Sequence, residues 1–332
     1  MKRILLTTVA ILIIGFCGCQ EGRKKPEANN LPLVEVQIHR YETDLFSIPS
    51  DALQEGLKSL ASRYPLFIGD QYSNPAGVMQ MYAYLSDPVI VEAYLEVQKQ
   101  FPDLVSTEKE LSKAFRMIRY YFPAWKPPSL YSYISGFDIE NGVFLSDSSL
   151  ILPLDNYLGV HYTPYKQVKI PQYLIQRMRA EYLVPDVVRT IGMALSSPFP
   201  NDDNLVAQMI AAGKLLYFAE SVLPDYPSHL LAGFTKEEYA WCIDNEQEIW
   251  GFFLGQDLLF TKDKLTLGKF MNEGPGTQGF PEGSPGRIGH FIGWQIVRSY
   301  AARHPETELK TMMENRELSR IFDESGYKPS KK

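Results

Sequence analysis

The chain is poor in cysteine and histidine, the residues on which many catalytic and metal sites depend. Its 332 residues include three cysteines and five histidines. Two of the cysteines, Cys17 and Cys19, lie at the N-terminus, so Cys242 has no partner for a disulfide within the rest of the chain. Its neighbours Trp241 and Ile243 indicate a buried thiol rather than a nucleophile.

Motifs for zinc, nucleotides and nucleophilic catalysis are also lacking. None of the histidines is followed by glutamate, so the H-E-x-x-H pattern that places two imidazoles on one helix face is absent. No P-loop, C-x-x-C pair or G-x-S-x-G elbow occurs. We therefore predict no metal and no cofactor. A metal site assembled from distant histidines stays open as an alternative; those histidines are His39, His161, His229, His290 and His304.

Positive charge does not dominate the chain. It has 33 Lys and Arg against 39 Asp and Glu, a formal net charge of −6. No basic patch with interleaved aromatic residues is visible, which argues against nucleic acid as a partner. Beyond the N-terminal run, no apolar stretch approaches the length needed to cross a bilayer. The remaining roughly 300 residues are enough to bury a large core.

The N-terminus has the layout of a bacterial lipoprotein signal. Two basic residues precede an uncharged run, 4–16, which has the length of a signal h-region and is too short to span a membrane as a helix. Cys19 follows the small residue Gly18 and is therefore the predicted lipid attachment site. An uncleaved anchor or an ordinary secretory signal is the alternative. We predict a signal peptide over residues 1–18 and a lipidated polar tether over residues 19–31.

Apolar spacing predicts a mainly α domain with a small β-sheet (α+β). Helical three- and four-residue steps run through 75–122 and again from Pro171 to the end of the chain. Short β-branched or aromatic stretches in 130–158, broken by Gly, Asn and Asp, predict two or three strands. A T-x-x-E capping box at 235–238 is expected to open one long helix. Because no linker interrupts residues 32–328, we predict a single domain there.

Two glycine-containing stretches invite a functional interpretation. GPGTQG at 274–279 matches G-x-G-x-x-G, but no strand precedes it and Phe-Pro follows it, so the setting of a dinucleotide site is missing. The later segment SPGRIGHFIGWQIVRSY combines an entry turn with helical spacing. In it, Gly289 and Gly293 lie one helical turn apart, which is typical of a core helix that another element approaches closely.

A series of segments spans nearly the whole mature chain: HRYETDLF, RYPLF, YSYISGF, LDNYLG, YLVPDVVRTIG, MIAAGKLLYFAESVLPD, GFTKEEYAWCIDNEQEIWGFFL, SPGRIGHFIGWQIVRSY and SGYKPS. In combination and order they resemble the gliding-motility lipoprotein GldB family of the Bacteroidota. The resemblance implies an envelope lipoprotein, held by lipid at Cys19, in the outer membrane. Its expected partners are proteins of the gliding apparatus or of a related envelope assembly.

Chains of this family also resemble, more distantly, predicted zinc peptidases in which a small sheet precedes the helices. Here the helix in the comparable place, PDVVRTIGMALSS, contains neither His nor Glu, and Ala212 precedes Gly213 where the peptidases carry Glu-Gly. The resemblance thus implies a degenerate zincin-like domain that is not an enzyme, with a cleft either closed or used for binding. The alternative is a hydrolase with an altered active site. Its candidate cleft residues are Arg189, Glu220, Arg287 and His290.

Overall fold

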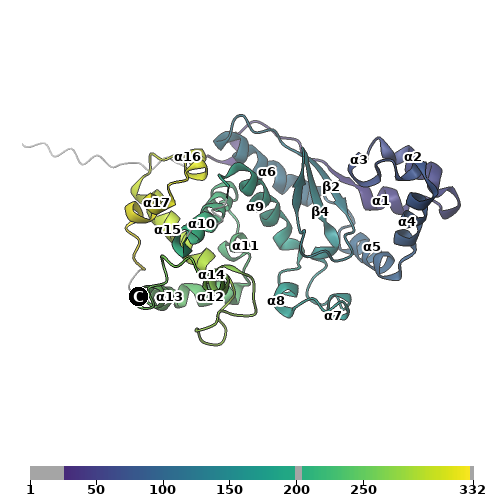
Figure 1. Cartoon of the computed structure of the whole chain (residues 1–332). Helices are drawn as coiled ribbons and strands as arrows, with labels where there is room; N and C mark the ends of the chain where they lie inside the picture. Colours follow the sequence, from purple (N-terminus) through teal and green to yellow (C-terminus); the bar gives the residue numbers. More distant parts are fainter. Residues whose placement is uncertain (1–25, 199–203, 330–332) are drawn as a thin grey trace, which may run out of the picture.

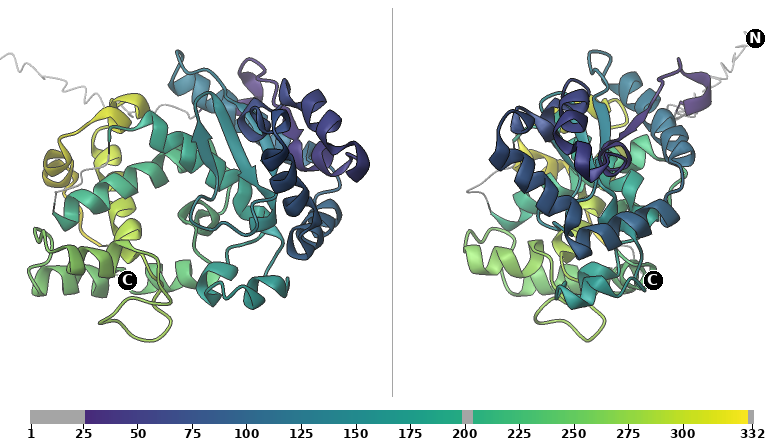
Figure 2. Two further views of the ribbon diagram at one scale, coloured as in Figure 1. Left: turned by 45° about the vertical axis from the view of Figure 1, so that its right-hand side comes forward. Right: turned by 90° about the vertical axis from the view of Figure 1, so that its right-hand side faces the viewer.

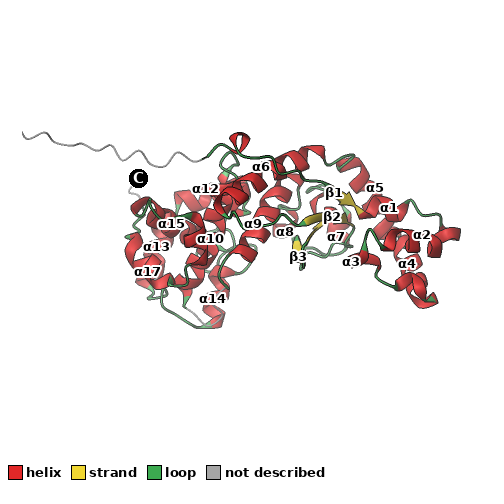
Figure 3. Cartoon of the chain, turned by 90° about the horizontal axis from the view of Figure 1, so that it is seen from above, coloured by secondary structure: helices red, strands yellow, loops and turns green. Residues whose placement is uncertain are grey.

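The computed structural model describes residues 26–198 and 204–329 (Figure 1). The predicted signal peptide and Cys19 lie outside these ranges. The elements follow one another in space much as in sequence, from N-terminal helices through a small sheet to C-terminal helices (Figures 1 and 2). Helices dominate the described chain and the sheet is small (Figure 3), which confirms the predicted mainly α fold with a small sheet.

The sheet has four strands in the order β1-β2-β4-β3. β2 (Ser129–Tyr133) and β4 (Ser149–Pro153) pair in parallel, with Leu130 opposite Leu150. β3 (Phe144–Ser146) runs antiparallel to β4, and β1 (Ile38–Arg40) pairs in parallel with β2. All five residues of β4 are buried, as expected for a strand flanked on both edges. The strands predicted in 130–158 are confirmed, and β1 adds a fourth from a distant segment.

Five helices lie at the N-terminal end (Figure 2); the first four surround a small core of their own, and the buried residues of the fifth belong to the main core. They are α1 (Tyr41–Phe46), α2 (Leu53–Ala61), α3 (Pro65–Ile68), α4 (Pro75–Ser86) and α5 (Pro88–Gln100). The side chains of Asn74 and Asp87 accept backbone hydrogen bonds at the first turns of α4 and α5, and a proline follows each cap. Both features stabilise helix starts, because they leave fewer backbone donors unpaired.

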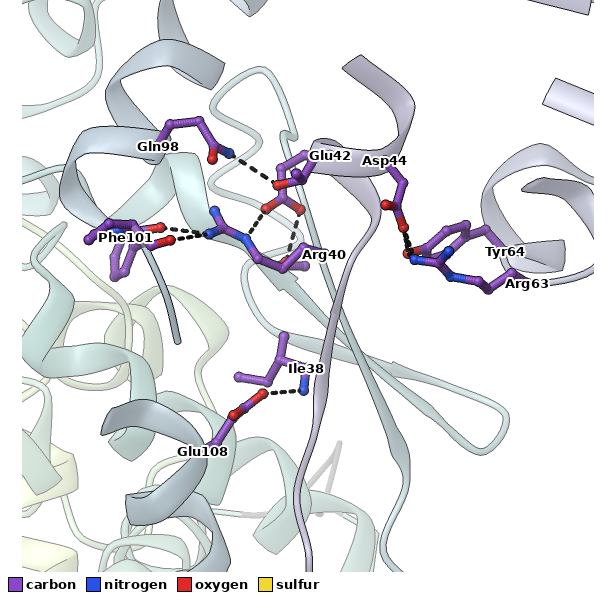
Figure 4. Close-up of polar contacts among 12 residues, drawn as sticks. Ile38, Arg40, Glu42, Asp44, Arg63, Tyr64, Gln98, Phe101 and Glu108 are labelled. Atoms are coloured by element: carbon purple, nitrogen blue, oxygen red, sulfur yellow. Dashed lines mark hydrogen bonds and ion pairs between the residues drawn. The ribbon is translucent and has the colours of Figure 1, made fainter. Parts of the chain in front are cut away.

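A buried carboxylate attaches these helices to the sheet (Figure 4). Glu42 is 1% exposed and accepts hydrogen bonds from Arg40 Nε and Ser132 Oγ, each at 2.8 Å. Arg40 Nη1 also donates to the carbonyl of Phe101, at the end of α5, over 2.7 Å. In the same view, Arg63 and Tyr64 donate to Asp44 on α1. The buried carboxylate of Glu42 is tolerated because it is paired with Arg40 and hydrogen-bonded to Ser132.

The C-terminal half is built on α10 (Leu205–Val222), which lies against α9 (Leu183–Leu195) and α15 (Ile288–Arg303). By length and composition α10 could cross a membrane, so the expectation of no second apolar run of membrane length was wrong. However, 78% of this stretch is buried inside the fold, as in a core helix. Its apolar length reflects burial on nearly all sides by other helices.

The capping box is confirmed, but the single long helix was wrong. Thr235 and Glu238 bond each other's backbone amides at the start of α12 (Lys236–Asp244). The chain then breaks at Asn245, and α13 (Glu246–Gly255) follows. Asn245 Nδ2 donates to the carbonyl of Trp241 over 2.8 Å, and the Asn245 backbone N–H donates to the same carbonyl over 3.0 Å.

The remaining described helices complete the scaffold. α6 (Val105–Tyr121) packs on both α9 and α10. The others are α7 (Pro164–Gln167), α8 (Gln172–Ile175), α11 (Ser228–Ala232), α14 (Lys264–Met271), α16 (Leu309–Glu314) and α17 (Leu318–Ser325). GPGTQG lies in the irregular chain between α14 and α15, and Thr277 within it bonds back to Ser284 and Pro285. Neither flank of that loop is a strand.

Candidate functional site

Arg287 lies at the entry to α15 and belongs to a cluster of charged side chains. It is the N-cap of the helix, in a left-handed conformation with φ of 56°. Its Nη2 donates to the carbonyl of Gly233 over 2.9 Å, and its Nε lies 3.0 Å from Glu273 Oε2. Burial, reinforced by nearby Arg177, lowers the pKa of Arg287 to about 9 although Glu273 opposes the shift. The guanidinium is thus held with little water.

Arg177 joins the same two partners and was not anticipated from the sequence. Its Nη1 donates to the Gly233 carbonyl over 3.1 Å, and its Nη2 lies 2.7 Å from Glu273 Oε1. Gly233 ends α11 with a φ of 67°, a conformation that suits glycine. Nothing in the spacing of Arg177, Gly233 and Glu273 links them along the chain, so only the fold reveals this meeting point.

Arg189 reaches the cluster from α9. It pairs with Asp186, one turn earlier on the same helix, and its Nη1 donates to the carbonyl of Leu231 over 3.3 Å. Asp186 also accepts a hydrogen bond of 2.8 Å from the hydroxyl of Tyr157. Burial and the neighbouring Asp186 raise the pKa of Tyr157 well above its usual value, so the phenol stays protonated and donates.

We call Arg177, Arg189, Arg287, Asp186 and Glu273 the arginine cluster. It combines three guanidinium groups with two carboxylates, and a third carboxylate, Glu238, acts on Arg287 from outside the cluster. Guanidinium groups in a partly desolvated place attract an anion more strongly than they would on an open surface.

A cavity of about 140 Å³ opens beside this cluster. It lies between α8, α9 and η4 (Leu154–Tyr157), the 3₁₀ turn that follows β4. Its lining consists of Ile139, Gly142, Asn156, Tyr157, Leu174, Arg177, Met178, Tyr182, Asp186 and Arg189. Asn156 is 7% exposed and its Nδ2 donates to the carbonyl of Asp138, whereas its Oδ1 has no hydrogen-bond partner. A buried acceptor without a partner is costly and calls for an explanation.

The other two candidate residues do not line this cavity. His290 Nε2 lies 3.1 Å from the carbonyl of Met271 and must carry the proton, because a carbonyl only accepts. Burial, with Arg287 nearby, lowers the pKa of His290 to about 3, so its ring is neutral at physiological pH. Its contact fixes the end of α14 to the start of α15.

Glu220 lies elsewhere, on the face of α10 that meets α15. It accepts hydrogen bonds from Trp294 Nε1 at 3.0 Å and from Arg298 Nε at 2.9 Å. The Arg298 guanidinium also stacks over the Trp294 ring, 3.7 Å from the ring centre. Of the four candidates, Arg189 and Arg287 therefore lie in one cluster. His290 bonds the end of α14 instead, and Glu220 bonds side chains of α15 outside the cluster.

The described lining of the cavity offers neither a metal site nor a carboxylate without an ion-pair partner. Among the described residues, no group of three or more His, Cys, Asp and Glu could hold a metal ion. The one carboxylate that lines the cavity, Asp186, is paired with Arg189 and bonded to Tyr157. Elsewhere, burial raises the pKa of the Cys242 thiol strongly, which agrees with the inert buried cysteine expected from its neighbours.

Comparison with known proteins gives one family. Residues 21–329 match the family described as gliding motility protein GldB. No curated protein and no solved structure matches the chain. The zincin-like arrangement thus stays a prediction, whereas the family match covers the fold and the arginine cluster described above. On this match, the chain belongs to the GldB family of gliding motility lipoproteins.

Proposed function

We propose that the protein is a lipid-anchored component of the outer membrane that serves gliding motility, or a related envelope assembly, without catalysing a reaction. The observation that carries the proposal is the family match over residues 21–329. The lipoprotein signal with Cys19 after Gly18 agrees with it. Proteins of the gliding apparatus or of the envelope are the proposed partners.

The ion pair between Asp186 and Arg189 on α9 supports a role in binding rather than catalysis. This helix follows the small sheet, in the place where the predicted zinc peptidases would carry their metal ligands. Here Asp186 and Arg189 neutralise each other, and both are further bonded, to Tyr157 and to the carbonyl of Leu231. A general base needs a carboxylate free to take a proton, and an ion-paired Asp does not meet that need.

The first described residues indicate how the anchor would hold the domain. Ala28 and Leu31 pack against the main core, and Val34 accepts a hydrogen bond of 2.6 Å from Ser112 on α6. Residues 20–27 then separate a lipid on Cys19 from the docked Ala28, which is at most about 30 Å of extended backbone. We therefore place the α6 side of the domain near the membrane.

The anchor is tested by Cys19→Ala, with Cys242→Ala as the matched control. In a gliding host that lacks the gene, we expect Cys19→Ala to lose radioactive fatty-acid labelling, to leave the membrane fraction and to fail to restore gliding. Cys242→Ala should keep all three properties. A Cys19→Ala protein that is released from the membrane and still restores gliding would contradict the membrane-tethered role.

The alternative of a hydrolase with an altered active site has its own test. Purified full-length protein would be incubated with a peptide library and its metal content measured. Stoichiometric zinc together with chelator-sensitive cleavage would overturn the non-catalytic proposal. The same holds for cleavage that disappears in Arg189→Gln but persists in Arg320→Gln, a control at an exposed arginine remote from the cavity.

A further inference from the structure

We propose that the cavity beside the arginine cluster binds a small carboxylate that also carries an N–H or O–H donor, either a free amino acid or the C-terminal residue of a peptide. The proposal goes beyond the gliding role and does not depend on it, because the ligand is inferred from the cavity alone.

Two arginines supply the carboxylate half of the recognition. Arg177 and Arg189 both line the cavity, and each carries five N–H donors in a planar fork. Arg177 uses two of its donors, on Glu273 and Gly233. Arg189 also uses two, on Asp186 and Leu231. Each guanidinium group therefore has N–H donors left for a ligand. Guanidinium groups match the two oxygens of a carboxylate well.

Asn156 supplies the second half. Asn156 lines the cavity, and its buried Oδ1 has no hydrogen-bond partner among the described residues, while its Nδ2 is already committed to the carbonyl of Asp138. An acceptor in this position calls for a donor on the ligand, and an amide N–H or a hydroxyl next to a carboxylate meets that need. Inorganic phosphate carries close to two negative charges near neutral pH, so it would be repelled by Asp186 in the lining more strongly than a carboxylate with one charge.

The size of the cavity limits the ligand. Its volume of about 140 Å³ is close to the ~150 Å³ of a cavity known to hold benzene, a molecule of six heavy atoms. Ile139, Leu174 and Met178 give one side of the lining an apolar character suited to a small aliphatic side chain. An alanine-sized group fits these dimensions.

The test is calorimetric titration of the detergent-solubilised full-length protein. The probes are N-acetylalanine for a peptide C-terminus, alanine for a free amino acid, acetate for the carboxylate alone, alaninamide for the donor alone, and inorganic phosphate. We expect saturable binding of N-acetylalanine or alanine, with acetate, alaninamide and phosphate each weaker by about tenfold or more. Whichever of the first two binds more tightly identifies the source of the ligand.

Two variants separate recognition from folding. Asn156→Ala should weaken binding of the preferred alanine probe to the level of acetate and leave acetate unchanged. Gly142→Leu should abolish all binding, because Gly142 lines the cavity and a Cβ there meets no atom within 4 Å, so the side chain enters open space. Gly251→Leu is the control, since Gly251 is equally open but lies on α13, outside the lining.

The proposal is overturned if neither alanine probe binds the wild-type protein at millimolar concentration. Binding that Gly142→Leu leaves intact would equally overturn it, as would binding of acetate as tight as that of the preferred alanine probe. Thermal unfolding of each variant confirms that it is folded before titration. Because gliding is not the readout, a failure here leaves the anchored role untouched, and failure of Cys19→Ala to change gliding leaves this proposal untouched.

Discussion

The crossing of α10 and α15 allows a sharp test of the packing, through Gly293→Ala. A Cβ on Gly293 would lie 1.7 Å from the carbonyl oxygen of Met209, where real Cβ contacts are not found below 3.0 Å. That obstacle is backbone of the facing helix, so the helices must separate locally by about 1.3 Å. Gly213 faces the same point, because its own Cβ would lie 2.2 Å from the Gly293 carbonyl carbon.

Whether Gly293→Ala raises or lowers the free energy of unfolding shows which is larger, the gain in helix propensity or the cost of overpacking. Helix propensity alone would make Gly→Ala stabilising by about 1 kcal/mol. Overpacking typically costs ~1–3 kcal/mol, and here the separation also loosens fully buried neighbours such as Trp294 and Ile292. The difference between the two is a net loss of up to about 2 kcal/mol, a sizeable share of the roughly 5–15 kcal/mol of a typical domain.

Urea unfolding of the full-length protein, followed by tryptophan fluorescence, measures the change. Gly251→Ala on α13 is the matched control: its Cβ meets no atom within 4 Å, so we expect it to stabilise the protein by about 0.5–1 kcal/mol. If Gly293→Ala is as stable as the wild type, the close contact of α10 and α15 is not real and the reasoning fails.

Three further predictions concern buried polar groups. Glu42→Ala should cost about 3 kcal/mol in urea unfolding, because it leaves Arg40 part-buried without its counter-charge, and the exposed control Glu317→Ala should change little. The folded-state pKa of His290 lies below its unfolded value, so its contribution to stability is present above about pH 6.5 and is lost as pH falls toward 3. Unfolding at pH 7 and 5 should therefore show a wild-type loss larger by up to about 2 kcal/mol than that of His290→Gln, and equal losses would contradict the depressed pKa. Cys242 should resist iodoacetamide in native protein and react only in urea, since burial suppresses its thiolate; rapid native labelling would refute this.

Local sequence patterns predicted much of the fold. The strand region 130–158, the capping box at 235–238 and the close approach at Gly293 follow from turn residues, helix caps and glycine spacing, all of which act over a few neighbouring residues. The break at Asn245 was not predicted because the apolar periodicity of the sequence continues through it. The apolar run of α10 was not recognised as one of membrane length; a helix buried on many sides lacks the polar stripe that marks surface helices.

The candidate site was only partly predictable, for a different reason. Arg189 and Arg287 were picked from their segments, but Arg177 and Glu273 became visible only where the Gly233 carbonyl gathers them. These contacts join α9, α11 and two loops, which are far apart in sequence, so no short-range sequence pattern predicts them. Charged residues in isolation look like ordinary solvated surface, so only their shared partner reveals the cluster.

The segments that carry the family resemblance turn out to be one another's neighbours. Glu42 of HRYETDLF bonds Ser132 of YSYISGF, and Asp155 of LDNYLG accepts two backbone amides from that same segment. Glu220 bonds Trp294 and Arg298 in SPGRIGHFIGWQIVRSY.

Each of these contacts secures backbone or packing, whereas the unpaired Asn156 Oδ1, also within LDNYLG, has no such part in the described fold. If the residues of LDNYLG served the scaffold alone, Asn156 Oδ1 would be expected to have a hydrogen-bond partner, as buried acceptors nearly always do. The proposed binding role would give that oxygen a partner, while Asn156 Nδ2 already contributes to the scaffold through the carbonyl of Asp138.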